Sequence, residues 1–359
     1  MGLTKPILRP VCKPGRGFIV TQSASNQRLV EVDGLRGLAA LGVAIFHLRV
    51  LLQGLPNPLN SVWGIDLILL KGWHLVDLFF VLSGFIFAHC YLRDGAMRAG
   101  VNLGEFASAR ISRLWPLHAA VLLFTALMLR GDPSTTVYNF FMSLALLHVF
   151  LPDIEVLNPP VWSISVEMIC YGLFATLAFQ RNRLVFLLGS IIFALIGLGL
   201  TWSGEAPMIG RGLLGFFLGT LVYRFRDPLG ALPAPALCLC LAPFLFLDGS
   251  MSSLLIQTAL CWPAAIILAP RLGWLSGRAF QWLGSRSYAI YIVHIPIYIF
   301  VGNLVALLPE TGGAIIVVAG VGTALLVADI LHRHIEGPAQ KFLRGRLFTR
   351  SRTGIAGIP

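Results

Sequence analysis

Charged residues are scarce in this sequence. Only 12% of its 359 residues are Asp, Glu, Lys or Arg, whereas 57% are hydrophobic. A typical soluble domain has about 25% charged residues, so this composition excludes a soluble globular enzyme. It predicts an all-α protein that crosses a membrane several times, so that chain length sets the number of helices.

Acidic residues are fewer than basic ones. The 16 Asp and Glu stand against 27 Lys and Arg, which gives a formal net charge of +11. In a soluble protein this excess would suggest a nucleic-acid partner. Here the basic residues flank apolar runs, where they orient a membrane protein and contact anionic lipid headgroups. We therefore expect a lipid bilayer, and no nucleic acid, as the partner of these charges.

The sequence has no cysteine pair with metal-binding spacing. The cysteines are Cys12, Cys90, Cys170, Cys238, Cys240 and Cys261. Most of them lie in apolar runs, which is typical of small buried side chains. We expect no metal site and no bound cofactor.

No soluble domain of any size is predicted. The expected organisation is a basic cytoplasmic tail over residues 1–30, a membrane domain over 31–338 and a second basic cytoplasmic tail over 339–359. Residues 1–30 are polar and lack an apolar core, so we expect no cleavable signal peptide.

Long apolar runs are abundant. A helix needs about 20 largely apolar residues to cross a bilayer. The predicted spans are 34–53, 73–92, 114–130, 161–179, 184–203, 208–225, 231–247, 251–270, 281–303 and 313–335. These ten spans form the predicted bundle.

One further apolar run, 138–151, has only about 14 residues, which is short for a span. If it does not cross, 22 of the 27 Lys and Arg lie on the same side as the N-terminus. Because cytoplasmic loops are rich in Lys and Arg, this distribution favours ten spans with both termini in the cytoplasm. The run itself is then an interfacial or re-entrant helix.

The first predicted span carries an Arg and a His. Arg36 and His47 are eleven residues apart, which is about three helical turns and roughly 16 Å of axial rise on one stripe. An ionisable residue inside a membrane helix costs about 2.5–3.5 kcal/mol, so such residues are functional candidates. The alternative is a basic side chain reaching the interface and a packed, hydrogen-bonded His.

Two further motifs point to chemistry. Arg110 and Arg113 share a helix face at the start of the third span, and guanidinium groups suit bidentate phosphate contacts. The alternative is ordinary anchoring of a cytoplasmic helix end.

Ser163, Glu167 and Tyr171 line one stripe of a helix that enters from the outer side. We expect Glu167 and His47 to meet at similar depth as an orienting carboxylate and a base; the alternative is a structural ion pair.

Together these stretches resemble the acyltransferase-3 family of integral membrane O-acyltransferases. The matching pieces, in family order, are VDGLRGLAALGVAIFH, DLFFVLSGFI, RISRLWPLH, WSISVEMICY, SYAIYIVHIP and HIEGP, between residues 32 and 338. Each piece alone is a weak match to the family, whereas the six pieces together are specific for it. The variety that the chain is most similar to is the bacterial exopolysaccharide or lipopolysaccharide O-acetyltransferase.

The resemblance implies a reaction and a location. An acyl group, acetyl by default, would pass from cytoplasmic acyl-CoA to a hydroxyl of a carbohydrate such as a surface polysaccharide. The protein would lie in the bacterial inner membrane, where polysaccharide assembly proteins are further expected partners.

The resemblance also implies site residues. His47 and Glu167 would be catalytic. The acyl-CoA-binding residues would be Arg36, Arg110 and Arg113. The residues shaping the substrate site would be Asp77, Ser165, Tyr171 and His294.

Two alternatives of other classes stay open on the residues alone. The buried Arg, His and Glu would also suit a secondary transporter of a polar or lipid-linked solute. Against it, no inverted halves or matched broken helices are visible. The second alternative is a non-catalytic membrane partner in polysaccharide assembly, in which loss of His47 would leave acetylation unchanged.

Overall fold

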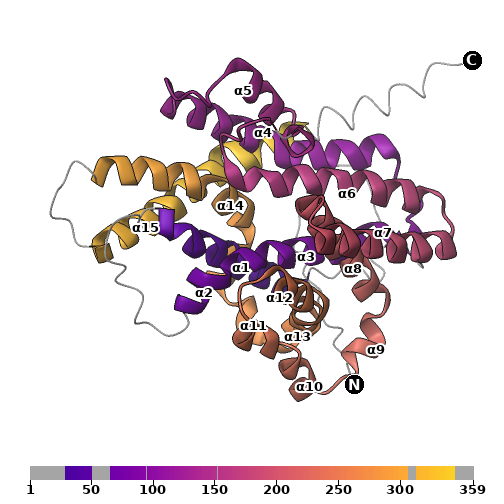
Figure 1. Cartoon of the computed structure of the whole chain (residues 1–359). Coiled ribbons are helices and arrows are strands. Elements are labelled where there is room, and N and C mark those ends of the chain that lie inside the picture. Colours follow the sequence, from indigo (N-terminus) through magenta and orange to yellow (C-terminus); the bar gives the residue numbers. More distant parts are fainter. Residues whose placement is uncertain (1–28, 51–64, 94, 152, 306–312, 344–359) are drawn as a thin grey trace, which may run out of the picture.

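The computed structural model describes residues 29–50, 65–93, 95–151, 153–305 and 313–343, and helices carry most of them (Figure 1). The longer helices are α1 (Val30–Phe46), α3 (Leu75–Tyr91), α4 (Leu103–Met128), α6 (Trp162–Phe179), α7 (Arg183–Ser203), α8 (Pro207–Arg224), α14 (Arg278–Val305) and α15 (Gly313–Leu331). The shorter helices are α2 (Ile65–Lys71), α5 (Val137–Leu144), α9 (Arg226–Gly230), α10 (Ala234–Leu239), α11 (Ala242–Phe246), α12 (Met251–Ile256) and α13 (Trp262–Leu268). A two-residue antiparallel hairpin, β1 (Leu92–Arg93) with β2 (Ala96–Met97), follows α3.

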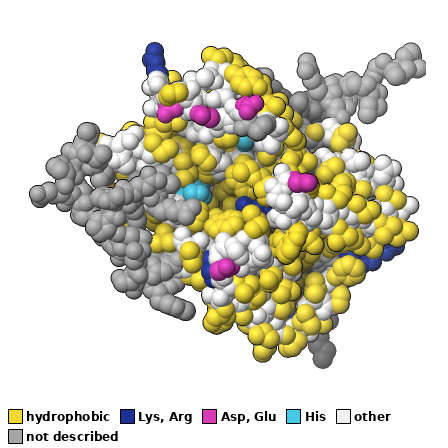
Figure 2. All heavy atoms as spheres, in the orientation of Figure 1, with side chains coloured by type: hydrophobic (Ala, Val, Ile, Leu, Met, Phe, Trp, Pro, Cys, Tyr) yellow, Lys and Arg dark blue, Asp and Glu magenta, His cyan; other side chains and the backbone are white. Residues whose placement is uncertain are grey.

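Seven helical segments within the described residues are long and apolar enough to cross a membrane. They are Leu67–Tyr91, Leu103–Met128, Pro159–Phe179, Arg183–Ser203, Met251–Arg271, Arg278–Leu304 and Val317–Leu343. They confirm an all-α, multi-pass membrane protein. Figure 2 shows hydrophobic side chains spread across one face, interspersed with polar side chains and backbone.

The predicted number of ten spans and the cytoplasmic placement of both termini stay predictions. Helix α1 has 17 residues and α8 has 18, and neither is among the seven segments. The predicted span 231–247 is interrupted, because Pro243 lacks an N–H group and a new helix, α11, starts beside it. The predicted tails lie almost wholly outside the described residues.

The run 138–151 contains only the eight-residue helix α5 and a 3₁₀ turn at His148–Phe150. Helix α5 buries its polar side chains Asn139 and Ser143 and exposes Val137, Tyr138 and Phe141. At about 1.5 Å per residue, eight residues are too short to cross a bilayer. The length of this helix therefore agrees with the prediction that the run 138–151 does not cross the bilayer.

Helices α1 and α14 pack unusually closely, because glycines line their contact. A Cβ added at Gly37 would collide with the backbone of Gly284, and one added at Gly284 would collide with the carbonyl of Asp33. Small residues allow membrane helices to approach in this way. The two helices run in the same direction, since Arg36 contacts Ser287 and, further along both helices, the Ala44 carbonyl accepts from Tyr298.

An aromatic cluster fills the space between α3, α4, α6 and α8. Its rings are those of Phe87, Tyr91, Phe106, Tyr171, Phe174 and Phe216. Phe87 is central, with stacked, tilted or edge-on ring contacts to each of the other five. This cluster supports one wall of the cavity described next.

Candidate active site

Two adjoining cavities lie within the bundle. The first, here called the chamber, is lined by Arg36, Val76, Phe79, Phe80, Leu82, Ser83, Ile86, Phe87, Arg113, Leu114, Ser163, Ile164, Glu167, Tyr171, Ser287, Tyr288 and Tyr291. The second, here called the vestibule, is lined by Leu29, Val32, Asp33, Arg36, Ile86, His89, Cys90, Arg113, Ser285, His332, Glu336, Gly337 and Gln340. Arg36, Ile86 and Arg113 line both cavities, so two guanidinium groups stand where the cavities meet.

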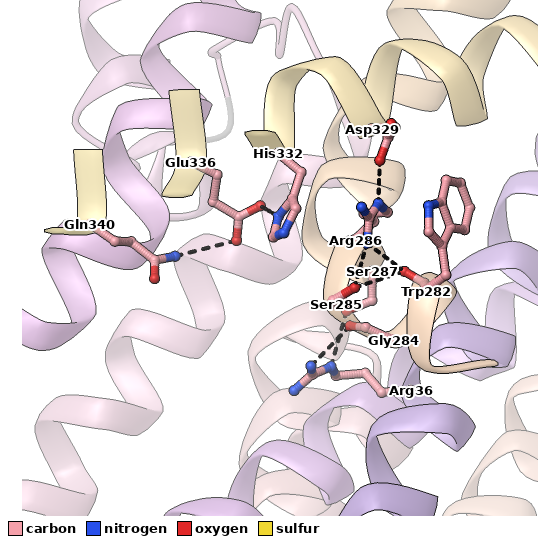
Figure 3. A network of polar contacts seen from close by, with 10 residues as sticks. All are labelled: Arg36, Trp282, Gly284, Ser285, Arg286, Ser287, Asp329, His332, Glu336 and Gln340. Carbon is pink, nitrogen blue, oxygen red and sulfur yellow. Dashed lines mark hydrogen bonds and ion pairs between the residues drawn. The ribbon is translucent and has the colours of Figure 1, made fainter. Parts of the chain in front are cut away.

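Arg36 is held at the junction of α1 and α14 (Figure 3). Its Nε donates to Ser287 Oγ at 3.0 Å, and one Nη donates to the Gly284 carbonyl at 3.0 Å. The same Nη lies 3.1 Å from the carboxylate of Asp33. Three contacts fix the guanidinium in one orientation, and the glycine packing described above brings its partners within reach.

Arg113 is placed differently. It lines both cavities, and no hydrogen bond or ion pair engages its side chain within the described part of the chain. Its guanidinium donors therefore remain available to an anionic ligand in either cavity.

Arg110 lines neither cavity, although it precedes Arg113 by one helical turn. Its guanidinium carbon lies 4.8 Å from the ring centre of Phe87 and 5.5 Å from that of Tyr91. It also donates to the Tyr91 hydroxyl at 3.0 Å. The structure thus separates the two arginines that the sequence places on one face.

Glu167 faces the chamber. One carboxylate oxygen, Oε1, accepts hydrogen bonds from Ser83 Oγ and from the Tyr171 hydroxyl, each at 2.5 Å. Tyr171 is one turn further along α6 and stacks on Phe87 with ring centres 4.2 Å apart. Both bonds end on Oε1, so these two donors leave the second oxygen of Glu167 for other contacts.

His47 lies beside a second histidine. His294 Nε2 is 3.1 Å from His47 Nδ1, which also lies 2.9 Å from the Val43 carbonyl. Since Val43 offers only an acceptor, His47 carries its proton on Nδ1, and His294 Nε2 is the acceptor because His294 Nδ1 donates to the Ile290 carbonyl at 3.2 Å. In this tautomer Nε2 is the nitrogen that carries the lone pair.

The predicted pairing of Glu167 with His47 is replaced by these contacts. Glu167 shares the chamber with Arg36 and Arg113, and His47 is not among the residues that line it. The chamber reaches toward the histidines through Tyr291, whose ring centre is 6.0 Å from that of His294. Helix periodicity placed each residue on its own helix but carried no information on how the helices are arranged.

Two other predicted residues lie in separate polar contacts. Asp77 is fully buried and forms an ion pair with Arg211 at 2.7 Å, with the guanidinium between the rings of Trp73 and Trp162. This pair joins α3 to α8.

Ser165 lies 3.2 Å from His148 Nε2, outside the chamber lining. Burial and the neighbouring His118 lower the pKa of His148 to about 4. His148 is therefore neutral at pH 7, and in this form it shares a hydrogen bond with Ser165.

Several lining residues were not predicted as site residues. Ser83 holds Glu167, Ser287 holds Arg36, and Tyr291 bonds to Ser163 at 2.7 Å. Ser83 and the pair Ser287 and Tyr291 lie within the stretches DLFFVLSGFI and SYAIYIVHIP. Their hydroxyl groups inside apolar runs were the signal that could have found them.

The vestibule is bordered by a polar network from the end of α15 (Figure 3). A π-helical turn at His332–Glu336 brings His332 Nδ1 to 2.8 Å from Glu336 Oε2, and Gln340 donates to Oε1 at 3.3 Å. Arg286 and Asp329 connect α14 to α15 nearby, at 2.5 Å. Within the described residues, no group of three or more His, Cys, Asp or Glu is arranged to hold a metal ion.

Comparison with known proteins agrees with the resemblance. A family model described as an acyltransferase domain, acyltransferase 3, matches residues 29–333. No solved structure matches this chain.

The similar proteins are named as O-acetyltransferases. The peptidoglycan O-acetyltransferase OatA of Listeria monocytogenes is 23% identical over 89% of this chain, which covers 57% of that protein. The putative peptidoglycan O-acetyltransferase YrhL of Bacillus subtilis is 23% identical over 86% of this chain, which covers 54% of that protein. The O-acetyltransferase OatA of Staphylococcus aureus is 24% identical over 88% of this chain, which covers 58% of that protein.

This chain therefore spans only a little over half the length of these relatives. The family model, by contrast, covers most of the chain, including every residue predicted for the site from Arg36 to His294. The chain belongs to the acyltransferase-3 family of membrane acyltransferases.

Proposed function

We propose that this protein transfers an acyl group, acetyl in the simplest case, from acyl-CoA to a hydroxyl of a carbohydrate. One observation carries the proposal. Two arginines stand at the junction of the vestibule and the chamber. Tyr291, which lines the chamber, lies beside His294, and His294 contacts His47. Acyl-CoA has the same layout, since its phosphates are separated from the thioester by a long arm.

The donor enters through the vestibule in this proposal. Arg113 and Arg36 bind its phosphates, because guanidinium groups match phosphate oxygens in geometry and charge. The arm then runs through the chamber past Glu167. The thioester comes to rest beyond Tyr291, within reach of His47. By the charge distribution of the loops, the vestibule faces the cytoplasm.

His47 acts as the general base. Its Nε2 takes the proton of the acceptor hydroxyl as the hydroxyl oxygen bonds to the acyl carbon. The bond from that carbon to sulfur then breaks, and the leaving thiolate of CoA takes the proton from His47. General base catalysis of this kind contributes about 10²–10⁴-fold. His294 accepts from His47 Nδ1 and stabilises the charged imidazolium.

The acceptor follows from what the relatives are called. Two of them are named peptidoglycan O-acetyltransferases, one of these putatively. We therefore propose a cell-wall glycan, peptidoglycan first, in place of the exopolysaccharide or lipopolysaccharide that the resemblance implied. The membrane is then the bacterial plasma membrane, with the acceptor on its outer side.

Mass analysis of cell-surface glycans tests the proposal. Glycans from cells with and without the protein are digested and compared, and the expected difference is 42 mass units per acetylated sugar, a value that follows from the chemistry of acetylation. Cells that carry the His47→Ala variant should match the deletion strain. Cells with His334→Ala, which alters an exposed histidine, should match the wild type. Identical masses in all four strains would exclude a carbohydrate acylation.

A further inference from the structure

We propose that Arg110 is a positioning residue for Tyr171 and Glu167, and that it does not bind the acyl donor. The inference rests on the proposed function. It divides the two arginines of the RISR stretch between two tasks: Arg113 faces the donor, and Arg110 supports the wall of the chamber that carries Glu167.

The surroundings of Arg110 are aromatic. Its guanidinium carbon lies 4.8, 5.5 and 6.0 Å from the ring centres of Phe87, Tyr91 and Tyr171. A cation within about 6 Å of an aromatic face is attracted to it. The hydrogen bond from an Arg110 Nη to the Tyr91 hydroxyl, at 3.0 Å, fixes the orientation of the guanidinium. These contacts face the aromatic cluster, and Arg110 lines neither cavity.

The aromatic contacts lead directly to the carboxylate in the chamber. Phe87 and Tyr171 stack with ring centres 4.2 Å apart and an interplanar angle of 17°. The Tyr171 hydroxyl donates to Glu167 Oε1 at 2.5 Å. A shift of the Phe87–Tyr171 stack therefore moves the hydroxyl that orients Glu167. Arg110 contacts both rings of that stack, so it sets the stack's position.

Arg113 provides the contrast. It lies one turn after Arg110 on α4, lines both cavities, and has no hydrogen bond or ion pair within the residues that the structure describes. The same side-chain type thus occupies two environments on one helix. A conservative change to lysine should affect different kinetic constants at the two positions.

Lysine is the informative substitution because it keeps the charge. An ammonium group is a point charge, and it cannot lie flat against the rings while donating along a fixed direction to Tyr91. In Arg110→Lys the stack loosens, so that transition-state stabilisation falls while donor binding is kept.

The experiment is steady-state acetyl transfer from acetyl-CoA by the full chain in proteoliposomes. For Arg110→Lys we expect a fall in kcat of at least tenfold with KM for acetyl-CoA within twofold of wild type. For Arg113→Lys we expect KM for acetyl-CoA to rise at least tenfold.

A second pair of variants tests the route through Tyr171. Tyr171→Phe keeps the stacked ring and removes only the hydroxyl, and should reproduce the kcat loss of Arg110→Lys. The double variant should lose no more than twofold beyond either single one, because both remove the same orientation of Glu167. If Arg110→Lys does not fold, Tyr91→Phe replaces it, with the same expected loss in kcat at unchanged KM.

Three results would overturn the assignment. The first is a rise in KM for acetyl-CoA in Arg110→Lys, or in Tyr91→Phe, with kcat unchanged, which would make Arg110 a donor ligand. The second is a double variant whose losses multiply. The third is a wild-type protein that consumes no acetyl-CoA, which would refute the proposed function itself and is recognised without any variant.

Discussion

At the scale of single residues, the site depends on which partner holds each ionisable side chain. The sequence predicted Arg36 and His47 on one stripe of one helix, and both lie on or directly after α1. Their partners could not be predicted, because Ser287 and His294 are about 250 residues away in the chain. Periodicity orders residues along a helix, whereas the packing of α1 on α14 decides which residues meet.

Glu167 allows a direct test of charge at this scale. In Glu167→Gln the side chain keeps an oxygen that accepts from Ser83 and Tyr171 but loses its negative charge. We expect kcat to fall by about 10²-fold, since a charge placed at the reaction contributes most of its effect in the transition state. KM for acetyl-CoA should stay within twofold.

The matched control is Glu205→Gln, which alters an exposed carboxylate after α7 and should leave both constants unchanged. If Glu167→Gln turned over at the wild-type rate, Glu167 would act only as a hydrogen-bond acceptor, and its charge would have no catalytic role.

At the scale of elements, the contact between α1 and α14 positions the arginine end of the site. The sequence predicted both spans, but it did not predict their parallel pairing, because glycine spacing alone does not identify the helix that approaches. A methyl group at Gly284 would meet the carbonyl of Asp33, beside the bond from Arg36 to the Gly284 carbonyl.

Gly284→Ala is therefore expected to destabilise the protein by about 1–3 kcal/mol, the usual cost of overpacking. It should also raise KM for acetyl-CoA, because Arg36 is displaced. Thermal unfolding in detergent and steady-state kinetics measure the two effects. Gly199→Ala is the control: among the described residues, nothing beyond its own stretch of α7 lies within 4 Å of the added Cβ, and alanine favours a helix. Equal melting temperatures for the two variants would contradict this packing account.

At the scale of the whole molecule, composition alone predicted an all-α membrane protein, and the seven apolar helical segments confirm it. The number of spans was harder to predict, because apolar runs such as 231–247 contain helix breaks that leave hydropathy unchanged. The orientation rests on charge: the loops assigned to the cytoplasm contain most of the Lys and Arg.

Cysteine labelling checks that orientation. In a chain without its native cysteines, Cys at Ser134 should react with an impermeant maleimide added to intact spheroplasts, because the loop before α5 is predicted outside. Cys at Asn182, before α7, should react only after the membrane is permeabilised. The reverse pattern would invert the topology, and would place the vestibule on the outer side, away from cytoplasmic acyl-CoA.

The central claim is that the protein transfers an acyl group from acyl-CoA to a glycan, with His47 as the base. Proteoliposomes with acetyl-CoA on the vestibule side and glycan fragments on the other test it most directly. The wild type should release one free CoA for each acetylated glycan. His47→Ala, with an unchanged melting temperature, should lose at least 10²-fold in both products. Undiminished acetylation by His47→Ala, or movement of glycan without release of CoA, would contradict the account.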